Sequence, residues 1–165
     1  MASTYPALAV LLPADQVPPA LASIDQAYEL LDVGSKSGPG ITTHSRHGEF
    51  GGFMRELCEG MGLRGLEFLY CKPWETPEGC CAFLFRGDDL PRLEEALDLA
   101  LDWARTHPAE FGGQDAVRRA LAAAPSFHPS LDDGQFIDYL LSLRAFARRA
   151  HAEGLGLLYA QWDGG

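Results

Sequence analysis

Residues 66–86 read LEFLYCKPWETPEGCCAFLFR, and this stretch decides the fold that we expect for the chain. Two runs rich in aromatic and apolar residues, Leu66–Lys72 and Cys80–Arg86, flank the segment Pro73–Gly79. Apolar runs on either side of a segment rich in proline and glycine are typical of a β-hairpin. The stretch therefore predicts two antiparallel strands, and an antiparallel sheet of which they form part.

Two further strands are expected near the ends of the sequence. Tyr5–Leu12 is an apolar run that Pro13 terminates, and Leu155–Trp162 is a second apolar run. Short apolar runs that end at proline or follow glycine are consistent with buried strands. Together with the hairpin they predict a sheet of about four strands.

Apolar residues recur at helical spacing between these strands. A first helix is expected to open at Pro18 and Pro19 and to stop at Gly34. Other helices are expected over Phe50–Gly62, Pro91–Arg105, Gln114–Ala124, and from a capping box at Ser130–Asp133 to Glu153, where Gly154 supplies the C-cap.

Strands and helices do not alternate regularly in this order, which argues against a doubly wound parallel sheet. We predict an α+β fold, with a mostly antiparallel sheet of about four strands and helices packed on one face. The length of 165 residues predicts a single globular domain over residues 1–165.

Composition limits the classes of partner. The formal net charge is -10, which argues against nucleic acid and against an anionic membrane surface as ligands, and favours a basic protein partner.

The N-terminal apolar run is too short to span a bilayer and lacks the basic start of a signal peptide, so we expect a cytoplasmic protein. We accordingly expect Cys71, Cys80 and Cys81 to be reduced, with inward thiols acting as small core groups. The sequence leaves the oligomeric state open.

The segment 34–52 holds six glycines and little periodicity. We therefore expect residues 34–49 to form a glycine-rich irregular loop. The loop carries the side chains of a candidate enzyme site: His44, Arg46, His47 and Glu49. Zinc sites use three or four ligands of recognisable spacing, which this loop lacks, so neither a tightly held metal nor another cofactor is expected.

An acidic cluster is the second candidate site. The helix expected over Pro91–Arg105 has an apolar face and an acidic side, and two more acids precede it. The six acids are Asp88, Asp89, Glu94, Glu95, Asp98 and Asp102. Like charges four residues apart on a helix are mildly destabilising, which favours a role in contacting a basic partner. Pairing with Arg144, Arg148 and Arg149 inside the same chain would remove that argument.

Three classes of function follow from these observations. We favour a non-enzymatic acidic protein-binding module, an inhibitor or immunity-type protein that docks on a basic partner. The first alternative is a small enzyme with its His and Arg site in loop 34–52, and the second is a chaperone or structural subunit. Convergence of the loop's His and Arg side chains on a pocket would favour the enzyme.

Overall fold

The fold is built on a sheet whose described strands lie in the order β2-β1-β4-β3, each paired antiparallel with its neighbour. The computed structural model describes residues 4–38, 40–46, 59, 80–130 and 134–162. The strands are β1 (Thr4–Leu12), β2 (Gly40–Arg46), β3 (Cys80–Phe85) and β4 (Gly156–Trp162). The α+β class and the antiparallel sheet are thus confirmed. Leu66–Lys72 lies outside the described residues, so the hairpin remains a prediction.

Four α-helices and two short 3₁₀ turns accompany the sheet in the described part of the chain. They are η1 (Ala14–Gln16), α1 (Ile24–Ser37), α3 (Asp89–Thr106), η4 (Pro108–Phe111), α4 (Gln114–Ala122) and α5 (Phe136–Glu153). The helix expected over Phe50–Gly62 falls outside the described residues apart from Glu59. Gly154 ends α5 in the left-handed conformation, with φ of 68°, as the sequence predicts.

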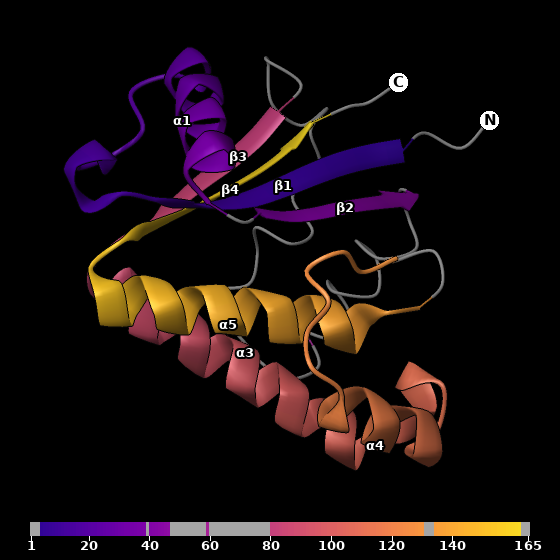
Figure 1. The fold of residues 1–165 in the computed structure, drawn as a ribbon. Coiled ribbons are helices and arrows are strands. Elements are labelled where there is room, and N and C mark those ends of the chain that lie inside the picture. The colour runs from indigo at the N-terminus through magenta and orange to yellow at the C-terminus, as the bar shows by residue number, and fades with distance from the viewer. Residues whose placement is uncertain (1–3, 39, 47–58, 60–79, 131–133, 163–165) are drawn as a thin grey trace.

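The helices cover both faces of the sheet, so the prediction that they pack on one face was wrong. Figure 1 shows α1 on one side of the sheet and α5 with α3 on the other. Side chains of β1 alternate between the two layers. Ala9 and Leu11 belong to the core beneath α3 and α5, whereas Val10 and Leu12 pack with Leu30 of α1. A strand that is apolar on both sides requires a cover on both sides, because successive side chains point to opposite faces.

The first helix begins at Ile24, not at the two prolines. Ser23 is the N-cap, and its hydroxyl accepts a hydrogen bond of 3.1 Å from the backbone N–H of Gln26. The Gln26 side chain in turn accepts from the N–H of Ala22 at 2.6 Å. A serine followed three residues later by glutamine is a helix-start signal, and here it overrides the proline pair.

The prediction of an irregular loop over residues 34–49 was wrong for Gly34–Ser37 and for Gly40–Arg46, although Gly38 is a bend that follows the helix. Gly34 lies inside α1 instead of stopping it, and Gly40–Arg46 forms β2, paired with β1. Gly34 is needed for packing, since a Cβ atom built on it would lie 2.4 Å from Cγ2 of Val10. Glycine therefore allows α1 to lie close against β1. Gly34 thus marks a close contact between two elements and not a break in secondary structure.

Candidate functional site

The acidic cluster on α3 is divided by the arginines of α5, which pair with two of its acids. Positions 94 and 98 are four residues apart and lie on the side of α3 that faces α5. Positions 95, 99 and 102 follow one another at spacings of four and three on another side, so they also share a face. The acids that the sequence groups together therefore differ in whether α5 engages them.

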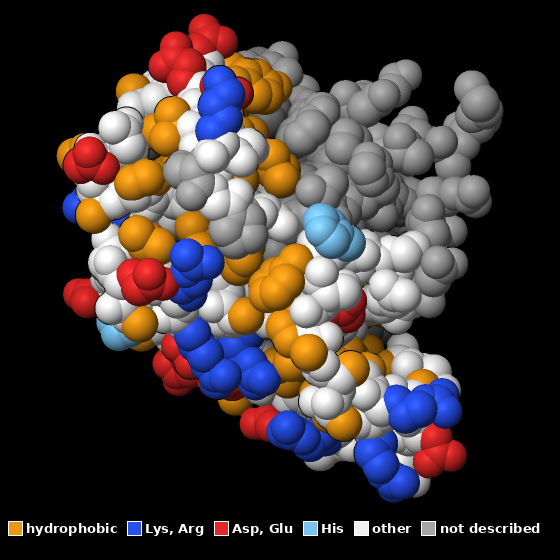
Figure 2. All heavy atoms as spheres, in the orientation of Figure 1, with side chains coloured by type: hydrophobic (Ala, Val, Ile, Leu, Met, Phe, Trp, Pro, Cys, Tyr) orange, Lys and Arg blue, Asp and Glu red, His pale blue; other side chains and the backbone are white. Residues whose placement is uncertain are grey.

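The inner acids, Glu94 and Asp98, are paired within the chain. Nε of Arg148 donates to Oε1 of Glu94 at 2.6 Å, and Nη1 of Arg144 donates to Oδ1 of Asp98 at 3.0 Å. Nη2 of Arg148 lies 3.7 Å from the same oxygen of Asp98. The hydrogen bond to Glu94 is the main cause that raises the pKa of Arg148 above its usual range. Figure 2 shows acidic and basic side chains side by side where these two helices meet.

The outer side of α3 carries a different set of side chains. Glu95 is exposed and makes no ion pair with any described residue. Asp102 is exposed and pairs with Arg105 three residues later, at 2.5 Å between Oδ1 and Nη1. Leu99 lies between them in sequence and is 49% exposed. We call Glu95, Leu99 and Asp102 the outer α3 face.

Two more acids lie where α3 begins. Asp88 and Asp89 are both exposed, and Oδ2 of Asp89 accepts a hydrogen bond of 3.3 Å from the backbone N–H of Arg86. Acids at this end of a helix are favoured by the helix dipole, which gives them a stabilising role in the fold. They add two exposed acids at the N-terminal end of α3.

The candidate enzyme residues fall on and beyond β2. His44 and Arg46 occupy alternate positions of this strand, opposite Pro6 and Thr4 of β1. His47 and Glu49 lie outside the described residues, so the convergence of the four on one pocket remains untested. Within the part of the chain that the structure describes, no group of three or more His, Cys, Asp or Glu residues could hold a metal ion.

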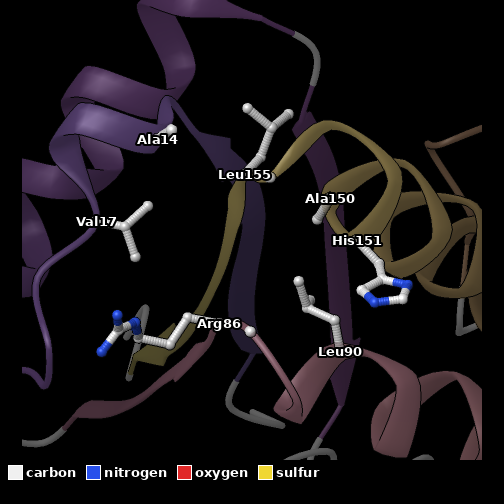
Figure 3. A pocket seen from close by; sticks show the side chains of 9 residues that line it. Ala14, Val17, Arg86, Leu90, Ala150, His151 and Leu155 are labelled. Atoms are coloured by element: carbon white, nitrogen blue, oxygen red, sulfur yellow. The ribbon is translucent and has the colours of Figure 1, made fainter.

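Sequence reasoning missed a small hollow between η1, the start of α3 and the end of α5. Its volume is about 200 Å³, and its floor includes Leu90 and Leu155. Arg86 and His151 line it, but Figure 3 shows the guanidinium group and the imidazole ring on opposite sides of Leu90. Nη1 of Arg86 donates instead to the carbonyl oxygen of Pro19 at 3.3 Å. The two side chains therefore do not converge on one ligand group.

Two further findings bear on the class of the protein. None of the described helices combines the length and the apolar character that crossing a membrane requires. Comparisons of the chain with protein-family models, with curated proteins and with solved structures returned no significant match.

Proposed function

We propose that this chain is a non-enzymatic acidic binding module that docks on a basic protein through the outer α3 face. The observation that carries the proposal is the exposure of Leu99 between two exposed acids on one side of the helix. Contact surfaces between proteins commonly combine an apolar centre with a polar rim. Leu99 would supply the centre, and Glu95 and Asp102 the rim.

Charge supports a basic partner. The net charge of -10 attracts a basic protein over distances longer than a contact, which raises the rate of encounter. Asp88 and Asp89 at the start of α3 add to this field. Glu94 and Asp98 contribute less, because Arg148 and Arg144 lie against them. The acids proposed to contact the partner are therefore fewer than the six acids that the sequence suggests.

We further propose that the partner is a protein whose own functional site is basic, so that binding would mask that site. This is the role of an inhibitor or immunity-type protein. It requires the partner to present Lys or Arg side chains around an apolar contact for Leu99. Such a protein would act by binding alone, and none of its side chains would take part in a reaction.

The test begins with a pull-down from the native host at low and high salt, followed by association kinetics with the recovered basic protein. Glu95→Lys should slow association severalfold at low salt, and the effect should fade as salt screens the charges. Leu99→Ala should mainly raise the dissociation rate, because truncating a contact residue affects the bound state.

Glu29→Lys is the matched control, since Glu29 is exposed on α1 and the change in net charge is the same. Because α1 covers the opposite face of the sheet from α3, Glu29→Lys should slow association much less than Glu95→Lys. Equal effects of the two variants would mean that only net charge matters and would contradict docking through α3. Asp98→Lys is unsuitable here, because it would also disturb the contact with α5.

A further inference from the structure

A groove lies between the last turn of α3, η4 and α4, next to the Asp102 end of the outer α3 face. Its volume is about 450 Å³. The hollow at Arg86 and another between α4 and the start of α5 are smaller, at about 200 and 260 Å³. Sites that enclose small organic ligands generally have volumes of about 300–1,000 Å³. Of these three hollows, the α3–α4 groove is the one large enough for such a ligand.

The groove joins apolar and basic side chains from different elements. Val117 and Leu121 are four residues apart on α4 and line it together with Pro108. Val117 is buried in the main core, so this wall is held firmly. Arg105 reaches the groove from α3, and Arg118 reaches it from α4.

Two glycines set the position of α4 in this arrangement. Gly112 and Gly113 have φ of 91° and 103°, a region of backbone conformation that favours glycine. They turn the chain between η4 and α4, so that both arginines line the same groove. The geometry therefore depends on a local backbone feature as well as on the amphipathic sequence of α4.

Both arginines are available to a ligand. Arg105 pairs with Asp102 and Arg118 lies 3.7 Å from Asp115, and all four side chains are largely exposed. Exposed ion pairs contribute little to stability, so exchanging such a partner for a ligand group costs little. Each guanidinium group carries five N–H donors. Among the described residues, Arg105 donates a hydrogen bond to Asp102 alone and Arg118 donates none.

We propose that the α3–α4 groove binds a small soluble carboxylate with an apolar tail. The tail would lie on Val117 and Leu121, and the carboxylate would accept hydrogen bonds from Arg105 and Arg118. Arginine matches the planar carboxylate through paired hydrogen bonds. Because the protein as a whole is acidic, the carboxylate alone should bind weakly, and binding should require both the tail and the two arginines.

The probe is sodium octanoate, titrated below its micelle concentration and followed by calorimetry and by amide chemical shifts. Octanoate should bind saturably, and acetate and 1-octanol should each bind at least about tenfold more weakly, because each lacks one of the two contacts. Absence of saturable octanoate binding at millimolar concentration would overturn the proposal. Equal binding of octanol would also overturn it.

Variants locate the site. Arg105→Gln and Arg118→Gln should each weaken octanoate binding by about tenfold, the effect of losing a charged hydrogen-bond partner. Arg119→Gln is the matched control, because Arg119 is exposed on the same helix but does not line the groove. It should change the affinity by less than about twofold. An equal effect of Arg118→Gln and Arg119→Gln would show nonspecific attraction and refute the site.

A steric variant tests the groove without removing charge. Ala122 is exposed, ends α4 and lines the groove, so Ala122→Trp should fill it and leave both arginines in place. Octanoate binding should then be lost while the circular dichroism spectrum is retained. Persistent binding would contradict the proposed location. These outcomes do not depend on docking through the outer α3 face, which Glu95→Lys tests separately.

Discussion

Nε of Arg148 lies 2.6 Å from Oε1 of Glu94, and this hydrogen bond ties α5 to α3. One turn away, Arg144 makes the corresponding contact to Asp98 at 3.0 Å. Both pairs are spaced by four residues, with the order reversed on the second helix, so the two contacts form a ladder between antiparallel helices. The charge repulsion that the sequence suggests on α3 is offset in the structure by arginines of the neighbouring helix.

Asp98→Lys should destabilise the protein by about 1–2 kcal/mol, because it replaces an attractive contact with repulsion from Arg144 and Arg148. Urea unfolding at low salt measures the loss, which should shrink at high salt. Glu95→Lys is the control on the same helix and should change the free energy of unfolding by less than about 0.5 kcal/mol. Equal losses in the two variants would mean that the ladder does not contribute to stability.

Gly34→Ala should destabilise the protein by about 1–3 kcal/mol, the usual cost of overpacking. The added Cβ would lie 2.4 Å from Cγ2 and 2.6 Å from Cβ of Val10, so α1 or β1 must shift. Gly38→Ala is the matched control, because no atom lies within 4 Å of a Cβ there and its φ of -178° is ordinary extended backbone. It should be neutral or slightly stabilising. Thermal unfolding of the two variants measures this difference in stability.

Several elements could be predicted from local sequence because local chemistry determines them. The apolar run ended by Pro13 gave β1, the periodicity of residues 91–105 gave α3, and Gly154 gave the end of α5. The position of Gly34 inside α1 could not be predicted this way, since its cause is the approach of Val10 from another element. The cover on both faces was predictable in principle. Ala9–Leu12 is four consecutive apolar residues, which leaves no polar face for solvent.

In the candidate site, too, contacts between distant elements could not be predicted from local sequence. Helical spacing alone does not separate Glu94 and Asp98 from Glu95 and Asp102, because Asp98 lies three residues after Glu95 and four before Asp102. The division comes from the arginines of α5, which pair with Glu94 and Asp98. The matching spacing of Arg144 and Arg148 was a usable signal, because two arginines four residues apart can meet two acids four residues apart. The α3–α4 groove had no comparable signal, since it arises from the turn at Gly112 and Gly113.

Ser142→Ala should destabilise the protein by about 1–2 kcal/mol, although it removes one atom. Ser142 is fully buried, and its Oγ accepts a hydrogen bond from the backbone N–H of Phe127 and donates to Oδ1 of Asp138, each at 3.3 Å. Phe127 has φ of 63°, an uncommon conformation for this residue that requires such support. Hydrogen exchange at the Phe127 amide should accelerate with the loss of stability.

Ser35→Ala is the control for this substitution, because Ser35 is exposed on α1. Its free energy of unfolding should change by less than about 0.5 kcal/mol. Unchanged exchange at Phe127 in Ser142→Ala would mean that the ring contact between Phe127 and Phe146, with centroids 5.4 Å apart, holds the residue without the serine.

Tyr139 should make the protein sensitive to alkali. Its side chain is fully enclosed, and burial is the main cause that raises the pKa of its phenol well above the usual value, with smaller contributions from Tyr159. A raised folded pKa means that the folded state retains the proton after the unfolded state has lost it. This contribution is therefore constant below the unfolded pKa of about 10 and is lost as the pH rises above it, by about 1.4 kcal/mol per pH unit.

Tyr139→Phe removes the ionisable group and should reduce the slope of stability against pH above about pH 10 by the same amount. Near neutral pH the variant should lose about 1 kcal/mol, because the hydrogen bond with Tyr159 is missing. The wild type should therefore be the more stable protein at pH 7 and lose its advantage in alkali. The measurement is urea unfolding across this pH range, with tyrosinate absorbance followed in parallel. Equal slopes of stability against pH for Tyr139→Phe and the wild type would contradict a raised pKa of Tyr139 in the folded state.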